Sequence, residues 1–185
     1  MSLPALFLDR DGVINIDKAY VHKPEDCEFV EGIFSLVSRA NNLGYKVIIV
    51  TNQAGIARGY YSEEQFLEFS AWMRQQFETK NARIDMIYFC PHHPVHGKGE
   101  YLTQCDCRKP EPGMFLRAKN DLDIDMSNSL MVGDNYSDLE AAKQAGIKKL
   151  FLLSHISSTP RESTASANLH ASVVHSLEKI VLHSF

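Results

Sequence analysis

The sequence predicts an α/β fold in which helices cover both faces of a mainly parallel sheet. Short apolar runs alternate along the chain with segments of helical spacing, which is typical of this three-layer arrangement. Several of the apolar runs are rich in Val, Ile and Leu, as strands buried on both faces are. A chain of 185 residues is long enough to bury a core, and we expect a single domain over residues 1–185.

Two strands and two helices are expected before residue 80. The run 3–8 is interpreted as the first strand, and 33–43 has helical spacing that ends at Gly44, a residue type favoured just after a helix. A second buried strand follows at 46–50. The next helix should begin at Ser62, because Ser-Glu-Glu-Gln fits a capping box. Its apolar stripe consists of Phe66, Phe69, Met73 and Phe77.

A third strand is expected at 86–89, and the stretch 90–112 after it has no regular pattern. Such a connection is too long to be ordinary, so it should be functional or organised by a metal. The segment 154–166 is rich in Ser and Thr and is predicted to be a mobile surface loop. The other expected elements are a helix at about 113–121, a strand at 129–132, a helix at 138–145 before Gly146, a strand at 149–153, and a short strand and helix within 173–182.

The composition is that of an ordinary globular protein, with 44% hydrophobic and 23% charged residues. A net charge of -4 gives no electrostatic reason to expect a nucleic-acid or acidic-membrane partner. No apolar run approaches the roughly 18 residues that cross a bilayer, and no basic start precedes a long apolar segment. We therefore expect a cytoplasmic protein, in which the four cysteines are metal ligands or free thiols rather than disulfides.

Acidic side chains follow the first expected strand as an Asp-x-Asp pair, Asp9 and Asp11. Residues i and i+2 at a strand end point to the same side, at the sheet edge where α/β folds place their sites. Such a pair alone is also common in ordinary loops. Three further polar segments lie close to apolar stretches and complete one chemistry: Thr51-Asn52-Gln53, Arg108-Lys109-Pro110 and Gly133-Asp134.

This chemistry is magnesium-dependent phosphoryl transfer. Asp9 can be the nucleophile that forms an aspartyl-phosphate, and Asp11 can be the general acid and base. Two carboxylates beside a phosphate require a divalent cation, and Mg²⁺ suits oxygen ligands, with Asp134 as a further ligand. Lys109 would balance the phosphoryl charge, and the Thr51 hydroxyl would bind a phosphoryl oxygen.

A second metal site is predicted within the long connection. Cys90, His92, Cys105 and Cys107 form two tight pairs that supply the Cys₃His set of a structural zinc site. The alternatives are a redox pair at Cys105 and Cys107, or unrelated buried thiols. Four protein ligands leave no open position, so the zinc should position the cations Arg108 and Lys109 that directly follow Cys107.

Four short motifs resemble those of the haloacid dehalogenase (HAD) superfamily of phosphatases: Asp9-Arg10-Asp11-Gly12-Val13, Thr51-Asn52, Lys109-Pro110 and Gly133-Asp134. Longer stretches are similar to a subgroup that acts on sugar bisphosphates: 50–59, Cys90-Pro91-His92-His93-Pro94 and 105–110. The similarity spans roughly residues 3–153. It implies a HAD-like Rossmannoid α/β/α fold with a zinc-binding loop at about 90–107, and the short connections leave no room for a large cap domain.

The resemblance also implies roles for particular residues. Mg²⁺ would be held by Asp9, the Asp11 backbone carbonyl and Asp134, and Arg108 would contribute to substrate recognition. Family members commonly carry Lys where this chain has Asn135, so Lys109 should be the main protein cation at the phosphoryl group. The implied substrate-binding residues are Asp17, Lys18, Ala19, Tyr20, Thr51, Asn52, Gln53, Ala54, Arg108, Lys109 and Asn135.

The expected partner is a small-molecule sugar phosphate bound by a monomer, with no nucleic acid and no membrane. Two other functions stay open at this point. Histidinol-phosphate phosphatases resemble this domain and share the zinc loop, and a catalytically silent HAD-fold binding protein could retain the zinc site. A zinc-based nucleic-acid module is excluded by the net charge and by the lack of a basic helix near the cysteines.

Overall fold

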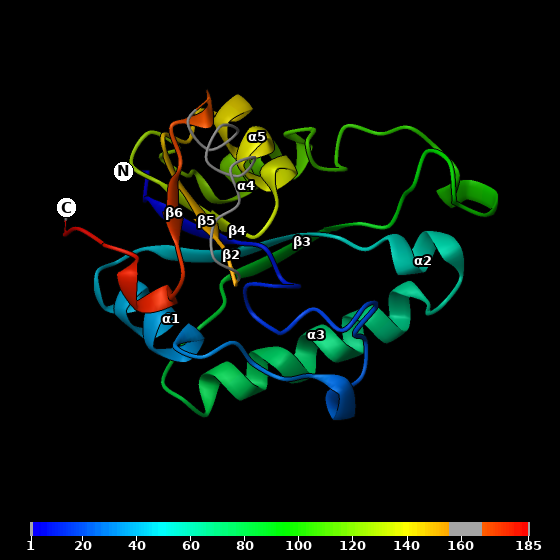
Figure 1. Cartoon of the computed structure of the whole chain (residues 1–185), viewed down its shortest axis with the longest axis horizontal. Coiled ribbons are helices and arrows are strands. Elements are labelled where there is room, and N and C mark those ends of the chain that lie inside the picture. The colour runs from blue at the N-terminus through cyan, green and yellow to red at the C-terminus, as the bar shows by residue number, and fades with distance from the viewer. Residues whose placement is uncertain (1, 156–167, 185) are drawn as a thin grey trace.

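The computed structural model describes residues 2–155 and 168–184. Within these residues a six-stranded sheet has the order β3-β2-β1-β4-β5-β6, and each pair of neighbours is parallel (Figure 1). This confirms the predicted parallel α/β class. The strands are β1 Ala5–Leu8, β2 Lys46–Asn52, β3 Met86–Cys90, β4 Leu130–Gly133, β5 Lys149–Leu153 and β6 Ser172–Val174.

Helices cover the two faces of the sheet and complete the predicted three layers. Figure 1 shows α1 and α3 on one face and α4 and α5 on the other, with α2 beyond the end of β2. The helices are α1 Ile33–Asn42, α2 Ala54–Arg58, α3 Glu63–Glu78, α4 Gly113–Leu122 and α5 Tyr136–Gln144. Short 3₁₀ turns lie at Pro24–Asp26, Gly99–Tyr101 and Leu177–Lys179.

The alternation of side chains along β1 divides the core into two halves. Leu6 and Leu8 pack in the cluster formed with α1 and α3, and Ala5 and Phe7 pack in the cluster formed with α4 and α5. Successive residues of a strand point to opposite faces, so a strand covered on both sides must be apolar throughout. All four residues of β1 are fully buried, which explains why this strand has no polar alternation.

The predicted starts and ends of several elements are confirmed. The Ser62 side chain accepts a hydrogen bond from the Gln65 backbone and completes a capping box at the start of α3. Gly44 follows α1 with a φ of +84°, a backbone conformation in which glycine has no Cβ penalty. In the segment 173–182 the structure has β6, which begins at Ser172, and a 3₁₀ turn.

Other boundaries differ from the prediction. β2 continues through Asn52, because its backbone pairing with β3 extends to Asn52 and Cys90. Helix α2 is not among the predicted elements; its five residues lie between Gln53 and Gly59. α5 begins at Tyr136, two residues before the predicted start, with Asn135 as its N-cap. Most of the predicted loop 154–166 lies outside the described residues.

The strand order places a crevice at the ends of β1 and β4. The chain proceeds outward from β1 to β2 and β3 on one side, and β4 lies against β1 on the other side, with Leu8 paired to Val132. Ligands of open α/β sheets bind at such a reversal point, outside the carboxyl ends of the strands. Within residues 2–155 and 168–184, no helix has the length and apolar character needed to span a membrane.

Candidate functional site

A cavity of about 340 Å³ opens at the carboxyl ends of β1, β2 and β4. The structure brings most of the predicted site residues to this cavity. Its lining consists of Asp9, Asp11, Asp17, Ala19, Tyr20, Asn52, Gln53, Ala54, Gly55, Tyr61, Lys109, Asp134, Asn135, Ser137 and Asp138.

Three of the predicted residues lie outside this lining. Thr51 is buried at the end of β2, where its hydroxyl accepts a hydrogen bond from the Gln53 side chain. Lys18 is exposed and pairs with Glu28 at 3.0 Å. Arg108 donates to the His92 carbonyl oxygen at 3.3 Å, on the side of the cysteine-rich loop.

Three carboxylates, those of Asp9, Asp134 and Asp138, converge within 4.8 Å of one another. The first two follow neighbouring strands, and a Cβ at Gly12 would lie 2.1 Å from an Asp134 oxygen, so only glycine leaves room for this approach. Burial, together with the Asp138 charge, raises the pKa of Asp9 well above its usual value, against the opposing effect of Lys109. The same two causes raise the pKa of Asp134 to about 6. The cluster therefore needs positive charge.

Lys109 supplies part of this charge. Its buried ammonium group donates to Asp9 Oδ1 at 2.8 Å and to the Val50 carbonyl oxygen at 2.8 Å, and it lies 2.6 Å from Asp138 Oδ1. Burial lowers the pKa of this lysine, but the charges of Asp138 and Asp9 raise it above the usual value. The Asn52 side chain exchanges two hydrogen bonds with the Lys109 backbone, at 3.0 and 3.1 Å, which fixes the lysine against the end of β2.

The remaining oxygen atoms of the cluster fit a divalent cation. Both oxygens of Asp138 face donors, because the Asn135 backbone N–H donates to Oδ2 at 3.1 Å and Lys109 lies at Oδ1. Asp9 has a contact with Lys109 through Oδ1, and Asp134 accepts from the Asn135 side chain through Oδ1 at 3.2 Å. The second oxygens of Asp9 and Asp134 can therefore bind a hard cation such as Mg²⁺.

The Asp11 side chain lies apart from the three clustered carboxylates. Arg10 Nη2 donates to both of its oxygens at 2.9 Å, Asn15 donates to Oδ1 at 3.0 Å, and Gln53 donates to Oδ2 at 3.2 Å. Arg10 is itself buried, with its guanidinium over the rings of Phe66 and Phe69. This set of donors holds the Asp11 carboxylate at the cavity in one orientation.

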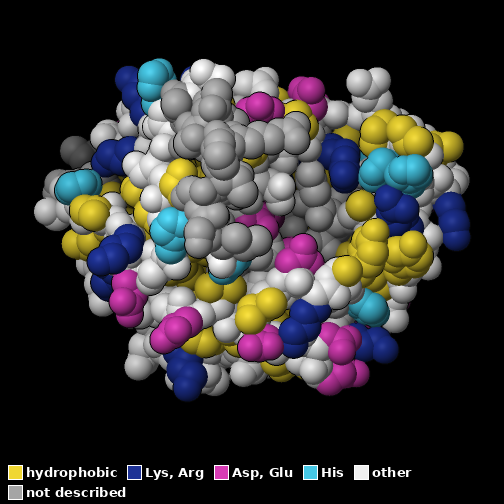
Figure 2. Space-filling model, viewed as in Figure 1, with side chains coloured by type: hydrophobic (Ala, Val, Ile, Leu, Met, Phe, Trp, Pro, Cys, Tyr) yellow, Lys and Arg dark blue, Asp and Glu magenta, His cyan; other side chains and the backbone are white. Residues whose placement is uncertain are grey.

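Asn135 brings no charge to the cavity. It is the N-cap of α5, and its side-chain amide is directed to Asp134. Lys109 is consequently the one cationic side chain that lines the cavity in the part of the chain that the structure describes. Figure 2 shows acidic side chains near the centre of this face, and basic and histidine side chains around its rim, including the side of α2 and the loop after β3.

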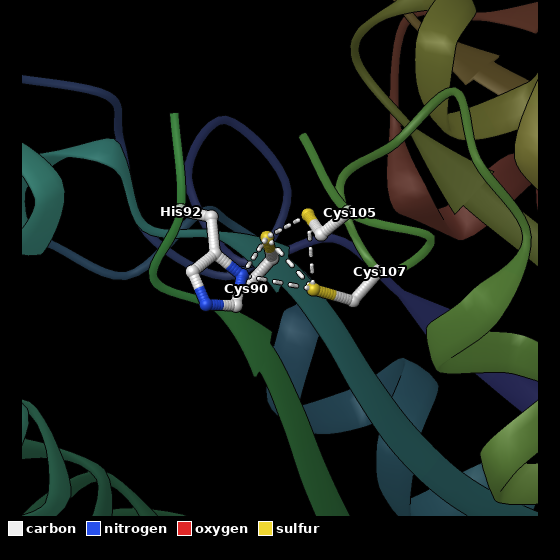
Figure 3. Close-up of side chains that lie close together, drawn as sticks. All are labelled: Cys90, His92, Cys105 and Cys107. Atoms are coloured by element: carbon white, nitrogen blue, oxygen red, sulfur yellow. Dashed lines mark hydrogen bonds between the residues drawn. The ribbon is translucent and has the colours of Figure 1, made fainter. Parts of the chain in front are cut away.

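The four predicted zinc ligands form a compact group beside the end of β3 (Figure 3). The Cys107 sulfur lies 3.0 Å from that of Cys90, 3.3 Å from that of Cys105 and 3.5 Å from Nδ1 of His92. Cys90 lies 3.5 Å from Cys105 and 3.8 Å from His92 Nδ1. Tetrahedral zinc with Zn–S bonds of about 2.3 Å places its ligands roughly 3.5–3.8 Å apart. The Cys90–Cys105 separation and both separations to His92 lie in this range, and those from Cys107 to Cys90 and Cys105 are shorter.

The electrostatics of this group also favour a metal. Hydrogen bonding with Cys90 lowers the pKa of Cys107 to about 5 against the effect of burial, and the same contact, with burial, raises the pKa of Cys90. A buried thiolate beside other sulfur atoms is the species that binds zinc. All four cysteines of the chain are free thiols, and Cys27 lies outside the group.

Two features of the site were not predicted from the sequence: the presence of Asp138, and the hydrogen bonds that Arg10 and Asn15 each donate to Asp11. Asp138 is the N3 residue of α5 and Asn135 is its N-cap, so the spacing Asn-x-x-Asp after Asp134 is the signal of a helix start that could have placed Asp138 beside Asp134. The other contacts had no such signal. Arg10 and Asn15 lie in irregular chain between β1 and α1, and their orientation depends on the tertiary structure.

Comparisons with known proteins agree with this geometry. Residues 106–180 match the HAD-hydrolase-like family model. The chain is 52% identical over 147 residues to a D-glycero-beta-D-manno-heptose-1,7-bisphosphate 7-phosphatase of Vibrio cholerae, covering 80% of this chain and 79% of that protein. It is 50% identical over 163 residues to a D-glycero-alpha-D-manno-heptose-1,7-bisphosphate 7-phosphatase of Burkholderia mallei, covering 88% and 86%.

A solved structure extends the agreement to the fold. The D,D-heptose 1.7-bisphosphate phosphatase from B. bronchiseptica, crystallised with magnesium and phosphate, superposes with a TM-score of 0.77 at 30% identity. The match covers 95% of this chain and 94% of that chain. The predicted HAD-like fold is thereby confirmed, and a neighbour of the same fold holds magnesium.

Proposed function

The chain belongs to the D-glycero-manno-heptose 1,7-bisphosphate 7-phosphatase family of HAD-like hydrolases, and we propose on this premise that it removes the 7-phosphate of that sugar. The product would be D-glycero-D-manno-heptose 1-phosphate, for the biosynthesis of nucleotide-activated heptose used in lipopolysaccharide core or related glycans. The observation that carries the proposal is the Lys109 ammonium group on Asp9, at 2.8 Å, inside a cavity of sugar-phosphate size.

The reaction proceeds in two steps, the transfer of the phosphoryl group to Asp9 and its hydrolysis from Asp9. An Asp9 carboxylate oxygen forms a bond to phosphorus while the bond to the C7 oxygen breaks, and Asp11 gives its proton to that oxygen. Asp11 then takes a proton from a water molecule whose oxygen attacks phosphorus, and the bond to Asp9 breaks. Inorganic phosphate leaves, and both carboxyl groups return to their starting states.

Lys109 and Thr51 stabilise the phosphoryl group during both steps. The lysine is already charged and fixed between Asp9 and Asp138, so it needs no reorganisation when negative charge develops. Asp138 would orient the ammonium group rather than bind the phosphoryl group. The Thr51 hydroxyl would donate to a phosphoryl oxygen, and it can do so because its own lone pair accepts from Gln53.

Asp9, Asp134 and the Asp11 backbone carbonyl would hold Mg²⁺. When bound, this cation neutralises charge on the phosphoryl oxygens and on the carboxylates around them. The two raised carboxyl pKa values and the convergence of the Asp9 and Asp134 carboxylates within 4.8 Å support this assignment.

We assign structural zinc to Cys90, His92, Cys105 and Cys107. The separations between the four ligand atoms support it, and the closed set leaves no position for substrate. Zinc would link the end of β3 to the residues directly before Arg108 and Lys109, so it would set the position of both cations.

The remaining predicted contacts concern the sugar and its second phosphate. Asp17, Ala19 and Tyr20 form one wall of the cavity, and Asn52, Gln53, Ala54 and Asn135 line it elsewhere. Lys18 and Arg108 would have to turn from their present partners to reach substrate. We propose this turn for Arg108, because its backbone is next to Lys109 in the cavity wall.

We further propose that residues 1–185 form one domain and that the enzyme is a monomer in the cytoplasm. The single sheet with both faces covered supports one domain, and four cysteines that form no disulfide suit a reducing compartment. Light scattering coupled to size exclusion tests the monomer directly: a mass of about twice 20.9 kDa would contradict it.

The test of the function is phosphate release with Mg²⁺ from the α and β anomers of heptose 1,7-bisphosphate, beside histidinol phosphate. We expect kcat/KM for one heptose anomer to exceed that for histidinol phosphate by at least about 100-fold. Preference for histidinol phosphate would assign the chain to that relative instead. Absence of phosphate release from all three would favour the silent binding protein, which the presence of Asp9, Asp11, Lys109 and Asp134 argues against.

A further inference from the structure

The side chain of Gln53 is fully engaged within the protein, although it lies at the cavity. It is 2% exposed. Its Nε2 group donates to Asp11 Oδ2 at 3.2 Å and to Thr51 Oγ1 at 2.8 Å, and its Oε1 accepts from the Tyr61 hydroxyl. A glutamine amide has two N–H donors. Both are used, so Gln53 has no donor left for substrate.

Gln53 lies in a different segment of the chain from the other hydrogen-bond partners of Asp11. Arg10 and Asn15 belong to the same irregular segment as Asp11, between β1 and α1. In the described part of the chain, Gln53 is the partner that contacts Asp11 from another segment, directly after β2. It therefore fixes Asp11 relative to Thr51, the residue proposed to bind the phosphoryl group.

Packing fixes the position of Tyr61, whose hydroxyl donates to the Gln53 amide oxygen. Its ring stacks on His22, with centroids 4.5 Å apart and an angle of 12° between the planes. It also packs with Ile56 and Phe66 and is 5% exposed. Burial raises the pKa of Tyr61 to about 12, so the hydroxyl stays protonated and donates at every working pH.

Gly55 leaves space for the Tyr61 ring because it has no side chain. A Cβ at Gly55 would lie 2.2 Å from Cε1 of the ring. Any other residue at this position in α2 would displace the tyrosine, and with it the hydroxyl that reaches Gln53. The ring position, the short hydroxyl contact and the two amide contacts form one continuous path to Asp11.

We propose that Tyr61 is a positioning residue for the proton transfer. Through Gln53 it holds the Asp11 carboxyl group in a fixed position relative to the site that binds the phosphoryl group. This inference rests on the proposed function, in which Asp11 protonates the leaving oxygen. It also changes the interpretation of Gln53, which positions Asp11 instead of binding substrate. A displacement of about 1 Å of an acid group from its reacting atom is enough to slow a reaction strongly.

The variants Tyr61→Phe, Gln53→Met and their combination test this path. Phenylalanine keeps the ring and removes the hydroxyl, and methionine keeps the approximate shape of glutamine without its hydrogen bonds. The matched control is Tyr88→Phe, which removes a tyrosine hydroxyl that donates to Asp121 at 2.9 Å and does not line the cavity. Burial raises the pKa of Tyr88 to about 12 as well.

The readout compares kcat/KM for two phosphate esters, since this ratio reports the steps through departure of the leaving group. A sugar alkoxide needs the Asp11 proton, whereas p-nitrophenolate leaves without it. We expect Tyr61→Phe to lower kcat/KM for the sugar bisphosphate by on the order of tenfold, through kcat rather than KM. With p-nitrophenyl phosphate the change should stay within about twofold. Tyr88→Phe should change neither ratio.

The double variant separates a path from two independent effects. If Tyr61 acts through Gln53, the double variant should have the activity of Gln53→Met alone. Additive losses, an equal fall for both esters, or a similar loss in Tyr88→Phe would overturn the inference. Any alkyl phosphate that the wild type hydrolyses can replace the heptose in this comparison, so failure of the proposed substrate and failure of the inference remain distinguishable.

Discussion

Replacing Asp134 by asparagine should stabilise the magnesium-free protein at neutral pH. Burial and the Asp138 charge raise the pKa of Asp134 from 3.8 to about 6. Between these values the folded state keeps a proton that the unfolded state has lost, so stability falls as the pH rises through this window. A difference of about two pH units corresponds to about 3 kcal/mol above pH 6. Asparagine has nearly the same shape and removes this charge.

The assay is thermal unfolding of wild type and Asp134→Asn in buffer without magnesium and without chelator, since a chelator would also remove metal from the cysteine cluster. At pH 7.5 the variant should gain up to roughly 6–12 °C, because about 3 kcal/mol shifts the midpoint of a chain of this size by that amount. At pH 4 the gain should nearly disappear. Added Mg²⁺ should stabilise the wild type and have little effect on the variant.

In a matched control, Asp125→Asn, the expected change in stability has the opposite sign. Hydrogen bonds from Ser127 and Asn128 lower the pKa of Asp125, which does not line the cavity, so Asp125→Asn should lose stability at pH 7.5. An Asp134→Asn variant that is less stable than wild type at pH 7.5 without magnesium would contradict the destabilising charge on Asp134. An equal gain at pH 4 and pH 7.5 would also refute it, because the effect would then not come from ionisation.

Three other variants test separate parts of the site. Cys107→Ala should lose bound zinc by elemental analysis and lower activity, while Cys27→Ala, outside the cluster, should retain it; full zinc content in the first variant contradicts the assignment. Lys109→Met should lose phosphate release and about 3–5 kcal/mol of stability in urea, because it leaves buried Asp9 and Asp138 unpaired; unchanged stability contradicts the buried ion pairs. Asn135→Lys should tighten product inhibition by inorganic phosphate several-fold, on the order of 1 kcal/mol; an unchanged inhibition constant would mean that this position does not face the phosphoryl group.

The buried strands and the long helices could be predicted from local sequence because their pattern and their burial agree. The apolar run that becomes β1 is buried on both faces, and the capping box at Ser62 is present as expected. The short helix α2 could not be recognised in this way. It has five residues between Gln53 and Gly59, and a helix of that length depends on its tertiary contacts more than on its own propensity.

The candidate site could be predicted where chemistry and strand ends coincide. Asp9, Asp134 and Lys109 meet at one cavity, and the cysteine ligands converge as their spacing indicated. The hydrogen-bond partners of each polar group could not be predicted from the sequence. The amide of Gln53 has the composition of a substrate ligand, yet its donors are directed to Asp11 and Thr51, which is decided by packing around Tyr61.

The role of Asp9 as the nucleophile is tested most directly by ³¹P NMR of heptose 1,7-bisphosphate during incubation with Mg²⁺ and either wild type or Asp9→Asn. The wild type should remove the resonance of the 7-phosphate, with inorganic phosphate appearing and the 1-phosphate retained. Asp9→Asn should fold, retain its zinc and leave both resonances unchanged. Loss of the 1-phosphate, or turnover by Asp9→Asn comparable to wild type, would contradict the central claim that Asp9 attacks the 7-phosphate.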